Sequence, residues 1–410
     1  MSSETIFIII LAIVIIGFFL EQLLDYLNAR WFNKPIPELL SDIYDTEKYK
    51  KQQNYMFDNY RFGIIVSTLS FILIILMLIT NGFAFVDHLA LKISNHYILR
   101  ALIFFFIIFF AFDILTLPFD IYDTFVIEKK YGFNKTTTKT YITDKIKSWL
   151  ISLIIGGLLL TVILYIYGLN PEYFWLFAWL VTIAFSIFIN MFYSVIIVPL
   201  FNKQTPLDDG ELRTAIMKFG NNAGFNISNI FVIDGSKRST KANAYFSGLG
   251  PKKRIVIYDT LISEMTTEEI VSVLAHEIGH YKNKDIYKNM FFSIIESGFM
   301  FFIFGLFAGN DTLSQALGVE KASFHIALIA FGIIYSPIST LIGIFSNIQS
   351  RKAEYQADNY AKKYGLANSL ISSLKKLSSH NMSNLTPHPW VVFISYSHPT
   401  LYDRVKNLLK

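Results

Sequence analysis

The chain has 410 residues, of which 53% are hydrophobic and 16% charged, with 39 phenylalanines. This composition excludes an ordinary soluble enzyme and indicates a membrane protein. The formal net charge is only +5 and lies mostly in a few loops, so it indicates contact with anionic lipid headgroups and no nucleic-acid partner. The absence of cysteine excludes disulfides, thiolate metal ligands and a cysteine nucleophile.

Seven segments are long and apolar enough to cross a bilayer, which takes ~20 mostly apolar residues. They are Ile6–Leu24, Phe62–Thr80, Ala101–Phe119, Trp149–Tyr167, Phe174–Val198, Met290–Ala308 and Phe324–Ile348. The first segment has neither a basic n-region nor a small-residue cleavage site, so we predict an uncleaved span. The chain thus divides into spans one to five (1–201), a polar region (202–289), spans six and seven (290–348) and a C-terminal region (349–410).

Lysine and arginine are concentrated in the loops after the first and third spans and are scarce after the second, fourth and sixth. Positively charged loops stay in the cytosol, so we predict an external N-terminus and a cytosolic C-terminus. The regions 202–289 and 349–410 then lie together on the cytosolic side. Asp113, within the third span, is expected to face an internal cavity, because a carboxylate at membrane depth needs water or a partner.

The region after the fifth span predicts a small sheet. A turn-rich segment, Thr205–Gly210, leads into a helix from Glu211 to about Asn222. Short runs rich in β-branched and aromatic residues follow at Asn229–Ile233, Ala242–Ser247 and Arg254–Tyr258. Residues 243–246 would suit an edge strand that holds an extended peptide, the alternative being an ordinary strand within the sheet.

The pattern H-E-x-x-H follows on a predicted helix whose start is marked by Thr266 and Glu269, the spacing of a capping box. His276 and His280 lie four residues apart and therefore on one helix face. Their imidazole nitrogens can reach a single Zn²⁺ at ~2.0–2.1 Å. Glu277 lies further round the helix, where it can act as a general base on a metal-bound water.

A catalytic zinc site keeps three protein ligands and one open position, so a third ligand is needed. The extended motif with a third histidine is excluded, because Asn283 and Ile286 occupy the required positions. Two glutamates remain: Glu296 in the sixth span and Glu354 after the seventh. We favour Glu354, which lies on the same side as the motif helix. Asp358, four residues further, can orient a ligand histidine, although a solvated ion pair is the alternative for both carboxylates.

His398 precedes a short last helix and could donate a hydrogen bond to a developing oxyanion, the alternative being a structural histidine.

Together these motifs resemble the type 1 CAAX prenyl protease family of membrane zinc metalloproteases. The resemblance covers nearly the whole chain. It rests on 276–280, 354–358, 397–404, 125–128, 132–137, 199–203, 243–246 and 254–256.

This resemblance implies a mainly α polytopic membrane protein in which seven transmembrane helices enclose a water-filled chamber, with a small α+β zincin-like catalytic domain on the cytosolic side. It implies one Zn²⁺ per chain, and as substrate a peptide or protein with a C-terminal, often prenylated, cysteine. By resemblance, the metal ligands are His276, His280 and Glu354, the catalytic residues are Glu277, His398 and Asp358, and the substrate-binding residues are Asn243, Ala244, Tyr245 and Arg404.

Alternatives remain at this point. The chain ends soon after Arg404 with no lysine-based retrieval tail, which favours a bacterial cytoplasmic membrane over the endoplasmic reticulum. A membrane quality-control metalloprotease would share the zinc ligands. A non-catalytic channel or transporter would explain Asp113 and Glu296 but not the H-E-x-x-H helix.

Overall fold

Long helices form wherever the sequence stays apolar for the thickness of a bilayer. The computed structural model describes residues 1–225, 229–247 and 254–410. Within these residues, seven helical stretches are long and apolar enough to cross a membrane, and each contains most or all of one predicted span. They are Ser3–Ala29 (α1), Thr46–Ile79 (α2), Tyr97–Tyr131 (α4, η2 and α5), Thr138–Leu169 (α6, η3 and α7), Phe174–Phe201 (α8, η4 and α9), Asp285–Phe307 (α13) and Phe324–Lys363 (α15).

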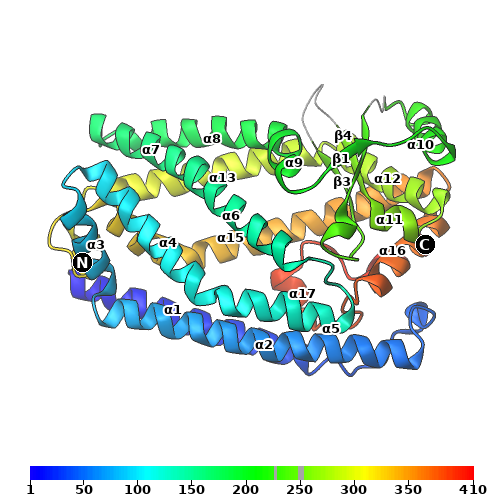
Figure 1. Cartoon of the computed structure of the whole chain (residues 1–410), viewed down its shortest axis with the longest axis horizontal. Helices are drawn as coiled ribbons and strands as arrows, with labels where there is room; N and C mark the ends of the chain where they lie inside the picture. The colour runs from blue at the N-terminus through cyan, green and yellow to red at the C-terminus, as the bar shows by residue number, and fades with distance from the viewer. Residues whose placement is uncertain (226–228, 248–253) are drawn as a thin grey trace.

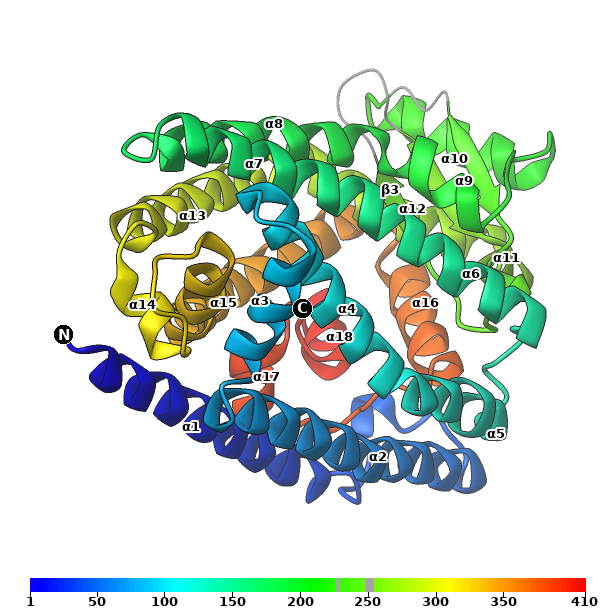
Figure 2. The same cartoon turned by 60° about the vertical axis from the view of Figure 1, so that its left-hand side comes forward.

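Three of these stretches contain a π-helical turn. The turns are η2 (Asp123–Glu128), between α4 (Tyr97–Tyr122) and α5 (Lys129–Tyr131); η3 (Ser152–Gly156), between α6 (Thr138–Ile151) and α7 (Gly157–Leu169); and η4 (Tyr193–Ile197), between α8 (Phe174–Phe192) and α9 (Val198–Phe201). Two short helices, α3 (Gly82–Ile93, Figure 1) and α14 (Asp311–Ala316, Figure 2), connect spans at the end remote from the sheet.

The spans pack loosely. Only 6–17% of the residues in each apolar window are buried inside the molecule. Each helix therefore touches its neighbours along a narrow stripe, as α1 touches α2 and α8 touches α13. Figure 2 shows the long helices standing around the sides of the molecule, with α17 and α18 visible between them. This low burial agrees with the predicted chamber, because a closely packed seven-helix bundle would bury more of each span.

A buried ion pair joins three helices at the end remote from the sheet. Asp87 in α3 is only 3% exposed. It accepts a hydrogen bond from Arg100 Nε, at the start of α4, at 2.7 Å, and its Oδ1 lies 2.7 Å from His325 Nε2, at the start of α15. A buried carboxylate is tolerated only when it is paired in this way, so the cluster fixes the three helix ends relative to one another.

Asp113 has partners within the protein, and its expected position beside a cavity stays a prediction. Lys145 Nζ lies 2.8 Å from Asp113 Oδ1, and Trp149 Nε1 donates to Oδ2 at 3.0 Å. Both partners come from α6, the helix that continues into the fourth span. The same lysine also contacts Asp120, at 3.1 Å.

The polar region 202–289 contains a four-stranded sheet in the order β1-β2-β4-β3. β2 (Ile230–Ile233) runs parallel to β4 (Arg254–Tyr258), and β3 (Ala244–Ser247) pairs antiparallel with β4 at the edge, so the three predicted strands and the edge position are confirmed. β1 (Gln204–Pro206), antiparallel to β2, was expected to be part of a turn. Proline can occupy such an edge strand, where its missing N–H costs no ladder bond.

The motif helix α12 (Thr267–Lys282) begins with the predicted capping box. Thr266 N donates to Glu269 Oε2 at 2.8 Å, and Glu269 N donates to Thr266 Oγ1 at 3.3 Å. Around α12 lie α10 (Glu211–Asn222), α15 and α16 (Ala367–His380). The remaining short elements are η1 (Glu38–Leu40), η5 (Gly235–Lys237), α11 (Asp259–Glu264), α17 (Pro389–Ser395) and α18 (Leu401–Leu409).

α15 continues without a break for 40 residues, from the seventh span into the polar region. The helix extends past Ile348, the predicted end of the seventh span, because no residue there ends it. α12 crosses it closely at Gly279, where an added Cβ would lie 2.9 Å from the Cα of Ala357. This contact brings the H-E-x-x-H motif against the part of α15 that carries Glu354 and Asp358.

Candidate metal centre

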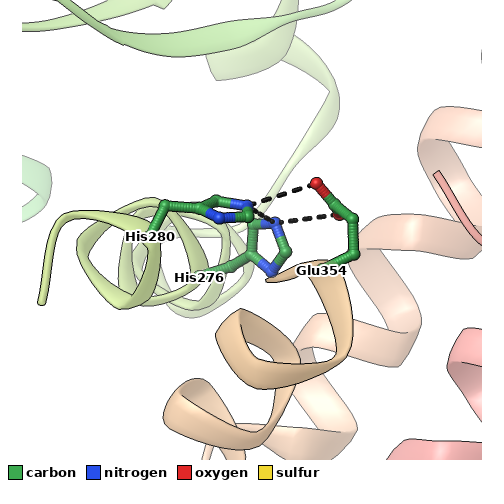
Figure 3. Close-up of side chains that lie close together, drawn as sticks. All are labelled: His276, His280 and Glu354. Carbon is green, nitrogen blue, oxygen red and sulfur yellow. Dashed lines mark hydrogen bonds and ion pairs between the residues drawn. The ribbon is translucent and has the colours of Figure 1, made fainter. Parts of the chain in front are cut away.

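Three side chains from α12 and α15 converge on one point (Figure 3). The Nε2 atoms of His276 and His280 lie 3.1 Å apart. Glu354 places Oε2 3.4 Å from His276 Nε2 and Oε1 3.2 Å from His280 Nε2. The described residues contain no other comparable group of three metal-ligating side chains. The predicted trio is thus brought together, whereas Glu296 lies outside it, in α13.

The spacing of this trio fits a zinc ion. Two ligand atoms bound tetrahedrally at ~2.0–2.1 Å stand about 3.3 Å apart, which matches the 3.1–3.4 Å found here. Glu354 Oε2 is buried and accepts no hydrogen bond from any described residue. Arg404 Nη1 lies 3.3 Å from this oxygen without forming a hydrogen bond, and a bound metal ion would satisfy the remaining need of the buried carboxylate oxygen. Two imidazoles and one carboxylate form a donor set typical of catalytic zinc.

Two further carboxylates hold the histidine rings by their other nitrogens. Asp358 Oδ1 lies 2.9 Å from His276 Nδ1, and Asp285 Oδ2 lies 3.0 Å from His280 Nδ1. Both carboxylates are buried, with 0% and 5% exposure. Each ring therefore keeps Nε2 directed at the metal point, the usual arrangement of histidine ligands. Asp358 was predicted in this position. Asp285 was not predicted, although it lies only five residues after His280.

Arg404, in α18, is buried behind the ligands. It donates from Nε to Asp358 Oδ2 at 3.0 Å and from Nη2 to Asp358 Oδ1 at 2.6 Å. Its Nη1 lies 3.3 Å from Glu354 Oε2. Burial alone would lower the pKa of Arg404, but the hydrogen bonds to Asp358 and the negative charges of Asp358, Glu354 and Glu277 together outweigh it and raise the pKa. Arg404 thus contacts the carboxylates of the site, and its contact with substrate stays a prediction.

The same carboxylates change the acidity of the two histidines in the metal-free protein. Burial alone would lower the pKa of each ring. Hydrogen bonds to Asp358 and Glu354 outweigh it and raise the pKa of His276. Hydrogen bonds to Glu354 and Asp285 raise the pKa of His280 to about 9. Metal binding needs neutral imidazoles, so an incoming ion must displace protons from this site.

Two more predicted residues lie beside the ligands. Glu277 is half-buried, and its carboxylate has no hydrogen bond or ion pair with a residue that the structure describes. His398 Nε2 lies 3.2 Å from Glu354 Oε1, and its Nδ1 lies 2.9 Å from Ser397 Oγ. The His398 side chain is 63% exposed, so it stands on the accessible side of the site.

The edge strand β3 contacts the motif helix α12. Tyr258 N donates to Asn243 O at 3.1 Å, so Asn243 and Tyr258 face each other as a hydrogen-bonded pair. Such pairs alternate along an antiparallel ladder, and Tyr245 therefore directs its backbone at β4. Ala244 directs its backbone at the free edge, although its N–H is taken by Asn243 Oδ1 at 2.8 Å. Of the three binding residues predicted around this strand, Ala244 thus directs its backbone at the free edge, whereas Asn243 and Tyr245 direct theirs at β4.

Comparisons with known proteins agree with this geometry. Residues 25–203 match the family described as CAAX prenyl protease N-terminal, five membrane helices, and residues 206–410 match Peptidase family M48. CAAX prenyl protease 1 homolog of Oryza sativa is 34% identical, over 97% of this chain and 96% of the relative. CAAX prenyl protease 1 of Saccharomyces cerevisiae is 32% identical, over 97% and 94%. The chain belongs to the type 1 CAAX prenyl protease family.

A solved member of this family has the same fold. The crystal structure of S. mikatae Ste24p superposes with a TM-score of 0.93 at 33% identity, over 100% of both chains. The predicted class is therefore confirmed: a mainly helical membrane protein with seven long helices around a chamber and a small sheet beside the metal centre. As a type 1 CAAX prenyl protease, the chain is a multi-pass membrane metalloprotease, which sets aside the channel or transporter alternative.

Proposed function

We propose that this protein is a zinc endopeptidase that cleaves C-terminal CaaX-type peptides, with or without a prenyl group, at the His276–His280–Glu354 centre. The observation that carries the proposal is the tetrahedral spacing of these ligand atoms around a buried Glu354 oxygen with no hydrogen bond. When bound, zinc supplies Lewis-acid polarisation of the scissile carbonyl and acidifies a coordinating water.

The protein's own residues supply the proton transfers and the orientation. Glu277, with no competing partner among the described residues, accepts the proton of the attacking water and gives it to the leaving amine nitrogen. His398, on the accessible side at 3.2 Å from Glu354 Oε1, donates a hydrogen bond to the oxygen that becomes negative. Asp358, Asp285 and Arg404 keep the ligands in place through their contacts with His276, His280 and Glu354.

The free edge of β3 is the part of the site suited to a peptide backbone. A strand added there would pair with backbone groups of Ala244 and Phe246, which face away from β4. Such pairing places few demands on side chains, which suits a protease that accepts varied C-terminal peptides. A prenyl group would add apolar contact at ~0.8 kcal/mol per CH₂ at most, improving binding without entering the chemistry.

The loop charges predict the orientation in the membrane: N-terminus outside, with the metal centre and C-terminus in the cytosol. The relatives compared above are eukaryotic proteins, from rice and yeast. Their names describe processing of CAAX sequences, which supports the substrate proposed here.

The test uses purified enzyme in detergent with two peptides of one CaaX sequence, one farnesylated and one not. We expect faster cleavage of the farnesylated peptide. Glu277→Gln should retain zinc and lose hydrolysis, because the amide cannot accept the proton. Equal rates for the two peptides would favour a quality-control protease. Cleavage by the Glu277→Gln variant at the wild-type rate would contradict the assigned base.

A further inference from the structure

A cleft between α2 and the stretch from the end of α4 to α5 joins charged and apolar surface, away from the metal centre. One cavity there, of about 560 Å³, is lined by apolar residues of both helices together with Asp58, Arg61 and Lys130. A second, of about 710 Å³, shares these three residues and continues along the polar part of α2. The shared residues make the two cavities parts of one depression, which we call the α2–α4 cleft.

The charged half of the cleft is cationic. Its lining includes Lys50, Lys51, Arg61 and Lys130 against Glu47 and Asp58, a net charge of +2. Asp58 is already satisfied, because Lys130 Nζ lies 2.6 Å from its Oδ2 and Tyr131 OH donates to the same oxygen at 2.7 Å. Lys50, Lys51 and Arg61 are exposed and form no ion pair with any residue that the structure describes. Three cations are therefore available to an anion.

The apolar half begins where these cations end. Phe62 stacks on Tyr122, with ring centroids 5.4 Å apart, and Ile65 and Val126 are 56% and 45% exposed. No charged residue follows Arg61 in α2 up to its end at Ile79. Arg61 thus marks the boundary between the apolar span and the polar extension of the helix.

This boundary matches the architecture of a lipid leaflet. Lys51, Asp58 and Arg61 lie three to seven residues apart on one face of α2, and the distance from Lys51 to Arg61 is about 15 Å along the axis. The headgroup layer of one leaflet is about 5–8 Å thick. Arg61 therefore lies at the depth of lipid phosphates, while Lys51 reaches into the water beyond them.

We propose that the α2–α4 cleft binds one anionic phospholipid, its phosphate beside Arg61 and an acyl chain along Phe62, Ile65 and Val126. The charge complementarity selects an anionic over a zwitterionic headgroup, as basic pockets beside membrane helices do. α2 and η2 contact each other, and both contact the bound lipid. The lipid therefore connects the polar extension of α2 to the end of the third span. Neither helix carries a residue of the metal centre.

The test is native mass spectrometry of the full chain in detergent, titrated with phosphatidylglycerol or phosphatidylcholine of identical acyl chains. The wild type should bind one phosphatidylglycerol in preference to phosphatidylcholine. Arg61→Gln should weaken phosphatidylglycerol binding about fivefold and leave phosphatidylcholine unchanged, the effect of one cation near an anionic surface. Arg30→Gln is the matched control, because Arg30 is an exposed cation that ends α1 outside the cleft.

A second variant tests the apolar half. Ile65→Trp keeps every charge and fills the cleft, so it should weaken phosphatidylglycerol binding while zinc content stays at the wild-type level. Equal loss in Arg30→Gln and Arg61→Gln, or no loss in Arg61→Gln, would overturn the proposal. Competition by glycerol 3-phosphate as strong as by the lipid would assign the cleft to soluble phosphates. Displacement of the lipid by a farnesylated peptide would assign it to the substrate.

Discussion

Gly279 is the residue between the two ligand histidines at which α12 lies directly against α15. An alanine Cβ there would lie 2.9 Å from the Cα of Ala357, 3.0 Å from the Cβ of Tyr360 and 3.2 Å from the carbonyl oxygen of Ala357. Two of these three atoms belong to the backbone and cannot rotate away. We therefore expect Gly279→Ala to separate the two helices that share the metal ligands.

The size of the effect follows from contact distances. Carbon atoms pack at ~3.5–4.0 Å, so the 2.9 Å contact requires a movement of at least about 0.6 Å. Metal–ligand distances are held to about ±0.2 Å, so the movement would separate Glu354 from the histidines by about three times the tolerance. Overpacking costs about 1–3 kcal/mol, and the better helix propensity of alanine offsets about 1 kcal/mol. Zinc affinity should fall at least about tenfold, as for changes around other metal ligands.

The assay is competition with a chelator of known affinity on purified protein, together with the zinc content by mass spectrometry. Gly343→Ala is the matched control, because it lies in α15 and an added Cβ meets no atom within 4 Å. The control should retain zinc as tightly as the wild type. Wild-type zinc affinity in Gly279→Ala would refute the argument that close contact of the two helices sets the ligand geometry.

Three further predictions follow. Asp285→Asn should weaken zinc binding about 10–100-fold, measured by the same competition, and unchanged affinity would show that Asp285 does not position His280. Zinc binding to the metal-free protein at pH 7 should release protons, because the pKa of His280 is raised to about 9 and zinc binds the neutral ring. For the same reason the affinity of the protein for zinc should rise with pH toward 9. Calorimetry in buffers of different ionisation enthalpy measures the proton release, and its absence would contradict the prediction. Cysteines introduced singly at Asn310 and Lys203 should label from outside only at Asn310, and external labelling at Lys203 would reverse the orientation.

The spans and the metal ligands could be predicted because each depends on local pattern. A run of about 20 apolar residues has few structural options, and the four-residue spacing of His276 and His280 fixes their shared helix face. Glu354 was predicted by a different argument: it follows the seventh span on the same side of the membrane as the motif helix, whereas Glu296 lies within the sixth span. The structure does bring Glu354 beside the two histidines, because α15 leaves the seventh span on the side of the molecule where α12 lies.

The residues that sequence reasoning missed depend on contacts between distant segments. Asp285 looks like the first-turn acid of the next helix, and only the turn after α12 brings it to His280. Gly279 looks like a poor helix former until α15 is seen beside it. For Arg404 the family resemblance implied substrate contact, and its burial against Asp358 became visible only with the tertiary structure.

α15 has a mechanical consequence for the whole molecule. This helix is about 60 Å long. Its end remote from the metal centre is held at His325 by Asp87, and Glu354 lies toward its other end. Glu354 lies 29 residues from His325, about 44 Å along the axis, so a tilt of 5° about the far end would displace the ligand by about 4 Å. The contact of α12 with α15 at Ala357 therefore has to hold the helix against such a tilt, because the ion pair at His325 is too far from the metal centre to do so alone.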